Sequence, residues 1–195
     1  MSQKEQIILV GGGGQCRASI DVIEQQGLYE IAAIVDIPSR VGQNVLGYPI
    51  SFTDDELPIL ATNYKHFLIT VGQIESPQPR LKLFRLLKQL NVSLPVIISP
   101  LAYISPHSEI GEGTIIMHHV LVNAGAVIGK NCIINSKALV EHDTRVEDFC
   151  HISTGAILNG EVTVGEQSFI GSNATLRQGV TIPVGSFIKA NTLVK

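Results

Sequence analysis

The stretch VNAGAVIGKNCIINSKALV, residues 122–140, decides the fold of this chain. Val122 opens it, and an aliphatic residue stands at every sixth position after Val122, up to Val140. A small residue stands four places after each of these, as Ala126 does after Val122. A helix repeats about every 3.6 residues and a strand about every two, so a period of six belongs to neither alone. Such a fixed period indicates a repeat architecture.

The six-residue register continues without interruption from Ile98 to the end of the sequence. Every sixth residue is isoleucine, leucine or valine: Ile98, Ile104, Ile110, Ile116, Val122, Ile128, Ile134, Val140, Val146, Ile152, Leu158, Val164, Ile170, Leu176, Ile182, Ile188 and Val194. The residues four places further on are small or β-branched: Ala102, Ser108, Thr114, Val120, Ala126, Cys132, Ala138, Thr144, Cys150, Ala156, Val162, Ser168, Ala174, Val180, Ser186 and Thr192. Glycine or asparagine often follows the aliphatic residue, and both tolerate the positive φ of tight corners.

A triangular solenoid accounts for this pattern. One hexapeptide forms one face, and three hexapeptides of six residues make a coil of 18 residues. The aliphatic residue fills the interior beside the small residue, and residues 18 apart stack in adjacent coils. We therefore predict a left-handed parallel β-helix over residues 98–195, an exception to the usual right-handed crossover. Cys132 and Cys150 lie one coil apart and should stack in the core as reduced thiols.

Residues 1–97 carry no such repeat and have the composition of an α/β domain. A β-rich run enters four successive glycines, Gly11–Gly14, and a helical segment and a second strand follow. This order predicts a small Rossmann-like α/β domain. The strands are expected at Gln6–Val10, Ile31–Asp36, Phe67–Val71 and Val92–Ile98, and the helices at Cys16–Gln26 and Pro79–Leu90.

The glycine run is a candidate nucleotide-binding turn. It falls short of the dinucleotide pattern G-x-G-x-x-G, because Cys16 stands where the third glycine would be. Asp36 ends the second strand, where Rossmann-like folds bind a ribose or a base. The domain has room for roughly four or five strands rather than about six, which favours a mononucleotide or a sugar nucleotide over NAD. A purely structural glycine turn is the remaining alternative.

Charge and cysteine content exclude several classes of protein. The formal net charge of −3 gives no basic patch for nucleic acid. The three cysteines form no CxxC pair and no disulfide framework, and a cytoplasmic location is the simplest expectation. No apolar run reaches the roughly 18 residues of a membrane span. The first residues show no apolar core of a signal peptide.

The histidines are the candidate catalytic groups. His142 is followed directly by Asp143. A neutral imidazole is a suitable general base near neutral pH, and an adjacent carboxylate can orient it and raise its basicity. A histidine beside an acid is also a common surface pair, so the residues alone leave both interpretations open. His66 and His107 have no chemistry-bearing neighbours in the sequence and are expected on the surface.

Two motifs carry a resemblance to a known family. The first is Asn135-Ser-Lys-Ala-Leu-Val-Glu-His142-Asp143, and the second is His151-Ile-Ser-Thr-Gly-Ala, with Asn-Gly160 shortly after. Together with the glycine-rich domain and the solenoid, these stretches resemble the sialic-acid O-acetyltransferase and bacillosamine-type nucleotide-sugar N-acetyltransferase family. The resemblance covers nearly the whole chain.

The resemblance implies a role for each matching residue. His142 would be the general base, and Asp143 would be the acid that orients it. Asn135 would lie near the acceptor amine, and His151 and Gly160 would contact the acetyl donor. The positions that would bind the sugar nucleotide in the N-terminal domain, residues 1–97, are Gly11, Gly13, Gly14 and Asp36.

The activity implied by the resemblance is acetyl transfer from acetyl-CoA to the 4-amino group of a nucleotide-linked amino-deoxy sugar. The amine would attack the thioester directly in a ternary complex, with no metal and no covalent enzyme intermediate. We also expect a homotrimer, because a solenoid of this kind leaves flat faces that such proteins usually bury by trimerising.

Three alternatives remain on the sequence. O-acetylation of a sialic acid keeps the same fold and chemistry. A zinc hydratase on this solenoid would need three histidines, two of them at H-x₄-H spacing, and no pair here has that spacing. A non-catalytic hexapeptide scaffold is disfavoured by the presence of His142, Asp143 and His151 together.

Overall fold

The computed structural model describes residues 4–195, and the chain forms two compact units. The first unit runs to Gly72 and resumes over Gln78–Pro95. The second unit consists of Gln73–Pro77 and Val96–Lys195. The segment Gln73–Pro77 therefore belongs with the solenoid, although the sequence had placed it in the first domain. The first three residues of that domain lie outside the described residues.

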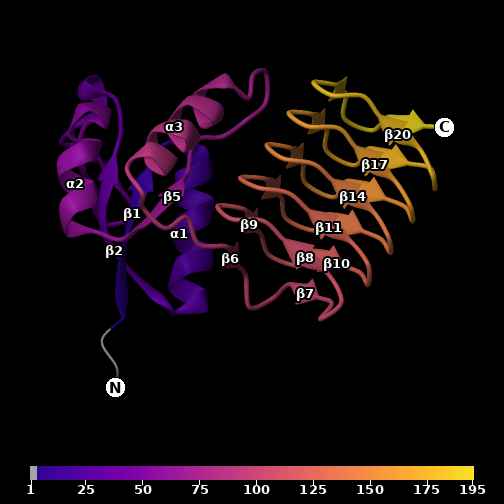
Figure 1. The fold of residues 1–195 in the computed structure, drawn as a ribbon, viewed down its shortest axis with the longest axis horizontal. Helices are drawn as coiled ribbons and strands as arrows, with labels where there is room; N and C mark the ends of the chain where they lie inside the picture. The colour runs from indigo at the N-terminus through magenta and orange to yellow at the C-terminus, as the bar shows by residue number, and fades with distance from the viewer. Residues whose placement is uncertain (1–3) are drawn as a thin grey trace. The chain divides into compact units, whose positions relative to one another are not determined.

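The first unit is a five-stranded sheet with helices on both faces. The strand order is β3-β4-β2-β1-β5, and all neighbours are parallel except β3 and β4. Helix α2 lies on one side of the sheet, and α1 and α3 lie on the other (Figure 1). The bounds are β1 Glu5–Val10, α1 Gly14–Gln26, β2 Tyr29–Val35, η1 Pro38–Arg40, β3 Asn44–Val45, β4 Tyr48–Phe52, η2 Asp54–Glu56, α2 Leu57–Asn63, β5 His66–Ile69 and α3 Gln78–Gln89.

The sequence explains the centre of this unit. The run Ile7–Val10 is buried along its whole length, which is typical of a parallel strand covered by helices on both faces. Gly27 ends α1 with φ of +70°, and its N–H donates to the Ile23 carbonyl. Only a residue that tolerates the left-handed region can close a helix in this way at low cost. The predicted α/β fold is confirmed.

Two parts of the first 97 residues differ from the prediction. The expected strand Val92–Ile98 is not continuous: Ser93 forms an isolated bridge to His66, and β6 is only Ile97–Ile98. Pro95 lies between them and has no N–H to donate to a ladder. The elements β3, β4 and α2 within residues 44–63 were not predicted, because they are short and carry weak periodicity.

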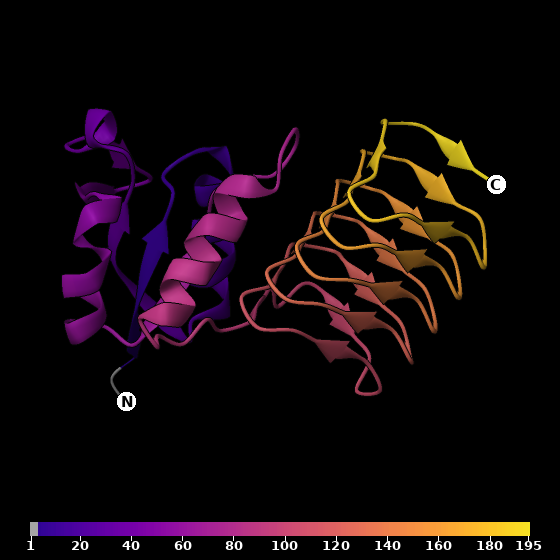
Figure 2. The ribbon, with the colours of Figure 1, turned by 45° about the horizontal axis from the view of Figure 1, so that its top comes forward.

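The second unit is a left-handed parallel β-helix, as predicted. Its strands form three sheets, β22-β19-β16-β13-β10-β7, β20-β17-β14-β11-β8 and β21-β18-β15-β12-β9-β6. Paired residues lie 18 apart, as Val122 and Val140 do. Figures 1 and 2 show the successive coils stacked along the solenoid. The two-residue strands are β6 Ile97–Ile98, β7 Tyr103–Ile104, β8 Glu109–Ile110, β9 Ile115–Ile116, β10 Leu121–Val122, β11 Val127–Ile128, β12 Ile133–Ile134, β13 Leu139–Val140, β14 Arg145–Val146, β15 His151–Ile152, β16 Ile157–Leu158, β17 Thr163–Val164, β18 Phe169–Ile170, β19 Thr175–Leu176, β20 Thr181–Ile182, β21 Phe187–Ile188 and β22 Leu193–Val194.

The interior of the solenoid is filled by the predicted aliphatic register. From Ile116 to Ile182, every sixth residue is at most 3% exposed to solvent. Cys132 and Cys150 are fully buried free thiols in this core, one coil apart. The hydrogen bond with Cys132, together with burial, raises the pKa of the Cys150 thiol. The Cys150 thiol therefore stays protonated, and both cysteines act as small core residues.

The outward faces of two sheets differ in polarity. The β8–β20 sheet points mostly polar side chains outward, with one valine among them: Glu109, Val127, Arg145, Thr163 and Thr181. The β7–β22 sheet points a largely apolar row outward, which we call the apolar ladder: Tyr103, Leu121, Leu139, Ile157, Thr175 and Leu193. Tyr103 and Leu193 are each 58% exposed, so the ladder is an open hydrophobic surface of this chain.

Two adjacent residues of β20 test the inward and outward assignment. Ile182→Ala should lower the free energy of unfolding by about 2–5 kcal/mol, because it removes buried methyl groups and leaves a cavity. Thr181→Ala, at the exposed position beside it, should change this free energy by less than about 0.5 kcal/mol. Urea denaturation followed by circular dichroism measures both. Equal losses in the two variants would contradict the assignment.

Candidate active site

The glycine turn after β1 lies at the carboxyl end of the sheet. Gly11 has φ of +108°, and a Cβ there would lie 2.9 Å from the Val71 backbone nitrogen. The Gly11 carbonyl accepts a hydrogen bond from the Thr70 hydroxyl. Glycine is therefore required at this position for the chain to pass close to the end of β5. Gly13 caps helix α1, and Gly14 begins it, with nothing within 4 Å of where its Cβ would be.

Asp36 is bound to this turn by its carboxylate. Its Oδ2 accepts a hydrogen bond of 2.8 Å from the Gly12 N–H, and its Oδ1 accepts one of 2.8 Å from the Ile37 N–H. Arg40 lies 2.9 Å from the same carboxylate and also donates to the Gly12 carbonyl at 2.8 Å. Asp36 therefore fixes the shape of the glycine turn through two backbone contacts and one ion pair.

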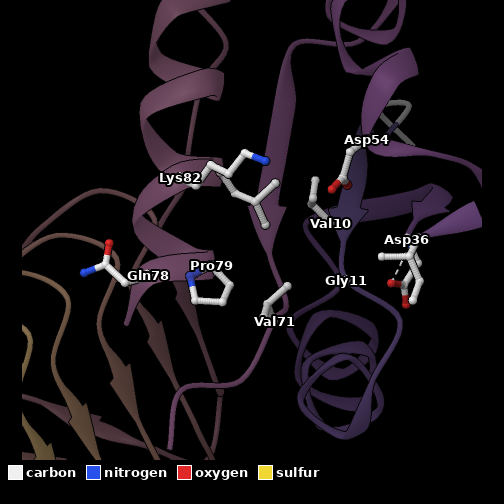
Figure 3. Close-up of a pocket in the computed structure, with 10 residues that line it drawn as sticks. Val10, Gly11, Asp36, Asp54, Val71, Gln78, Pro79 and Lys82 are labelled. Carbon is white, nitrogen blue, oxygen red and sulfur yellow. Dashed lines mark hydrogen bonds between the residues drawn. The ribbon is translucent and has the colours of Figure 1, made fainter. Parts of the chain in front are cut away.

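A cavity of about 590 Å³ opens beside this turn within the first unit (Figure 3). Its walls are largely apolar, and its charged lining groups are Asp36, Asp54 and Lys82. Burial raises the pKa of Asp54, and the nearby Asp36 raises it further, whereas Lys82 opposes this shift. Of the four residues predicted to bind the sugar nucleotide, Gly11 and Asp36 line the cavity, whereas Gly13 and Gly14 are not among its lining residues. Apolar walls with a few charged groups suit a flat, polar ring.

The predicted base lies on a corner of the solenoid, between β13 and β14. The His142 Nδ1–H donates to the Asp143 carboxylate, with Nδ1 and Oδ2 2.9 Å apart. This bond leaves Nε2 as the proton acceptor of the neutral ring. It also raises the pKa of His142, and the charges of Asp143, Glu141 and Glu161 add to the effect. Both side chains are about half exposed or more, so the imidazole is accessible.

His151 lies in β15 and is almost completely buried. Its Nδ1–H donates to the Gln73 carbonyl, and its Nε2 accepts a hydrogen bond of 3.3 Å from the Asn135 amide. The ring meets Phe169 edge-on, with centroids 5.1 Å apart. Gln73 in turn donates to the Phe149 carbonyl at 2.6 Å. The His151 ring therefore orients the Asn135 side chain.

The structure sorts the predicted residues of the solenoid into two groups. His142 and Asp143 lie together, and a Cβ at Gly160 would lie 2.6 Å from the His142 ring, so Gly160 is directly against this ring. Asn135 and His151 form the second group. Asn135 follows β12 and His142 follows β13, and these strands belong to different sheets, so the groups occupy different edges of one solenoid.

The other histidines have varied surroundings. His66 is buried, with its Nε2 3.0 Å from the Glu5 carboxylate, so the expectation of a surface position was wrong. This first residue of the edge strand β5 lies beside Ile7 of β1 and bridges to Ser93, and its ring contacts that of Tyr29 with centroids 5.3 Å apart, none of which the local sequence reveals. His107 is exposed, as expected. The His118 Nδ1 lies 2.6 Å from the Ser99 hydroxyl, which places this histidine in a side-chain hydrogen bond.

Residues 4–195 contain neither a metal-binding cluster nor a membrane-spanning helix. No group of three or more His, Cys, Asp or Glu side chains in this part of the chain could hold a metal ion. None of the helices in the same range is both long enough and apolar enough to cross a membrane.

Family models match most of the chain. The model described as the PglD N-terminal domain matches residues 6–87. The model described as bacterial transferase hexapeptide (six repeats) matches residues 107–142, and that described as hexapeptide repeat of succinyl-transferase matches residues 161–195. A search of curated proteins gave no match.

Solved structures with the same fold and related sequences include two acetyltransferases. One is perosamine N-acetyltransferase from Caulobacter crescentus, a histidine-to-asparagine mutant in complex with CoA and GDP-perosamine. It is 33% identical, with a TM-score of 0.91, and the match covers 97% of this chain and 89% of that one. The other is the acetyltransferase domain of PglB from Neisseria gonorrhoeae, at 30% identity and a TM-score of 0.88, over 96% of this chain and 90% of that one. The same domain was also solved with acetyl coenzyme A.

Proposed function

This chain belongs to the acetyl-CoA-dependent sugar N-acetyltransferases in which a PglD-type domain precedes a hexapeptide solenoid, and we propose that its acceptor is a nucleotide-linked amino-deoxy sugar. The acetyl group goes from acetyl-CoA to the 4-amino group of that sugar. The observation that carries this proposal is the exposed His142 with its Nδ1 bound to Asp143, on a solenoid like that of the Caulobacter enzyme.

In the proposed mechanism, His142 is the general base. The neutral acceptor amine attacks the thioester carbonyl and forms a tetrahedral intermediate, and the carbon–sulfur bond breaks when this intermediate collapses. The His142 Nε2 takes the proton that the amine loses, and coenzyme A leaves with its sulfur protonated in the end. Asp143 holds the ring in the tautomer that leaves Nε2 unprotonated. Because the thioester is already activated, no covalent enzyme intermediate is needed.

The second group of residues would position the substrates. The Asn135 amide nitrogen carries two N–H donors, and one of them goes to the His151 Nε2. The remaining donor is available to the acceptor sugar. His151 and Gly160 stay proposed contacts on the acetyl-donor side, where a backbone N–H can stabilise the oxyanion of the tetrahedral intermediate.

The cavity of the first unit is the proposed site of the nucleotide. The N-terminus of α1 begins at the glycine turn, and such a terminus favours a phosphate group. Lys82 and Asp54 give the cavity one donor cation and one acceptor anion for a base or a ribose. We also propose that the enzyme works in the cytoplasm, where acetyl-CoA is made and where its three cysteines stay reduced.

We further propose a homotrimer whose donor site lies between neighbouring solenoids. His142 and Asn135 occupy different edges of one solenoid, so one chain does not bring the two groups together. A neighbouring copy would supply the missing edge. The apolar ladder offers the surface for this contact, because Tyr103 and Leu193 expose more than half of their side chains.

A substrate screen tests the activity. With acetyl-CoA, one of the UDP-, dTDP- or GDP-linked 4-amino sugars should be acetylated, as measured by thiol release and mass spectrometry. Asp54→Asn should raise the KM for the sugar nucleotide by about tenfold, since it removes a charged group that lines the cavity. Asp55→Asn, at the next residue outside the cavity, should leave KM unchanged. Acetylation of free or CMP-linked sialic acid instead would refute the proposed acceptor.

Replacement of the base gives a second prediction. His142→Ala should lower kcat by about 10²–10⁴-fold, the usual contribution of a general base. The KM values should change little, because the ring acts on a proton rather than holding a substrate. Since Asp143 raises the pKa of His142, kcat/KM should rise with pH through a value above the ordinary histidine value of about 6.5.

This rise of kcat/KM with pH, the pH limb of His142, should be absent from His142→Ala. Deprotonation of the acceptor amine can add a second limb, but that one should appear in both the wild type and His142→Ala. Asp143→Asn should cost less activity than His142→Ala and should move the limb to lower pH, because the carboxylate that raises the pKa is gone. If His142→Ala keeps wild-type turnover, His142 is not the general base.

Light scattering tests the assembly. The wild-type protein at micromolar concentration should have three times the chain mass of 21.0 kDa. Ile157→Arg places a charge in the apolar ladder and should shift the mass toward that of the single chain. Thr163→Arg, on the outward face of the polar β8–β20 sheet, should remain a trimer. A monomeric wild-type protein would rule out a site shared between copies.

A further inference from the structure

The corner that carries His142 recurs from coil to coil, and its neighbours in the stack are unusually small. Ala124 lies one coil before His142, and Gly160 lies one coil after it. At the next place of the corner, Gly125 lies one coil before Asp143. The Asp143 N–H donates to the Ala124 carbonyl at 3.1 Å, which fixes these coils relative to one another.

The imidazole of His142 occupies the volume that a side chain at Gly160 would fill. A Cβ at that position would lie 2.6 Å from both Cε1 and Nε2 of the ring. The backbone does not require glycine, since Gly160 has no left-handed φ, and the same place in the stack holds Ala124 and Gln178 in other coils. The reason for glycine at this place is therefore the ring itself.

The carboxylate of Asp143 occupies the corresponding volume at Gly125. A Cβ there would collide with the Asp143 Oδ1. Gly125 has φ of +74°, but Asp143 and Glu161 take φ of +57° and +61° at the same place of the corner, so this place accepts side chains. Gly179 stands there too, with φ of +73°, and nothing lies within 4 Å of where its Cβ would be.

We propose that Gly125 and Gly160 are positioning residues for the catalytic base, which hold His142 and Asp143 in contact by leaving room on both sides. This inference rests on the proposed role of His142. A methyl group at position 160 would push the ring off its place and touch Nε2, the atom that takes the proton. A methyl group at position 125 would turn the carboxylate away from Nδ1.

The pKa of His142, measured by NMR titration of its ring, reports this contact without any substrate. The carboxylates that face the ring are Asp143, Glu141 and Glu161, and the contact with Asp143 has the largest effect on this pKa. In Gly125→Ala and Gly160→Ala the pKa should fall toward the value found in Asp143→Asn. The kcat of both variants should fall by about 10-fold to 100-fold, as expected for a displaced catalytic group. The KM values should stay near wild type in Gly125→Ala, because Gly125 is outside the proposed donor and acceptor contacts.

Gly179→Ala is the matched control. It places the same methyl group at the same place of the corner and nearly the same φ as Gly125→Ala, but away from His142 and Asp143. Its His142 pKa and its kcat should equal those of the wild type, and all three variants should keep a similar melting temperature. If Gly125→Ala and Gly160→Ala behave like Gly179→Ala while His142→Ala is inactive, the inference is overturned and the proposed function stands. If His142→Ala keeps wild-type turnover, the proposed function fails and the inference fails with it.

Discussion

The aliphatic register of the solenoid is the constraint on which the other features of the second unit depend. Each strand is only two residues long and has no stability of its own, so its place is set by the dry interior and by the coils on either side. Because stacked residues are always 18 apart, every corner side chain is held at a fixed position by its neighbours. The proposed catalytic pair, His142 and Asp143, lies on such a corner and is therefore attached to a rigid part of the fold.

The register also explains why half of the fold could be read from the sequence. Few folds can accommodate an uninterrupted period of six residues. The burial of every sixth residue from Ile116 to Ile182 follows directly from this period. The fold of the first unit was harder to predict from the sequence. Its central strand and the end of α1 at Gly27 have strong local signals, whereas β3 and α2 depend on tertiary contacts that no local pattern records. The burial of His66 is of the same kind, since contacts with Tyr29 and Ser93, which are distant in the sequence, contribute to it.

The site was predictable to the extent that its contacts are local. His142 and Asp143 are adjacent in the chain, and their hydrogen bond needs only one corner of the solenoid. The spacing of 18 would also have placed Gly160 beside His142, had it been applied to the corners as well as to the core. The contact of His151 with Gln73 could not be found in this way, because it joins the solenoid to a segment outside the repeat. Asp54 in η2 and Lys82 in α3 line one cavity because these elements follow β4 and β5, whose carboxyl ends lie at the same edge of the sheet.

The segment Gln73–Pro77 has a consequence for how this protein can be divided and recombined. After Gly72 the chain contributes the segment Gln73–Pro77 to the second unit and then returns to the first unit at Gln78. All residues after Pro95 belong to the second unit. The two units are therefore interleaved in the chain rather than consecutive. A chain that began at residue 96 would lack the carbonyl that holds the His151 ring, and a graft of a foreign N-terminal domain would have to bring an equivalent of Gln73. Exchange of substrate specificity by simple domain shuffling is thus limited by one hydrogen-bonded loop.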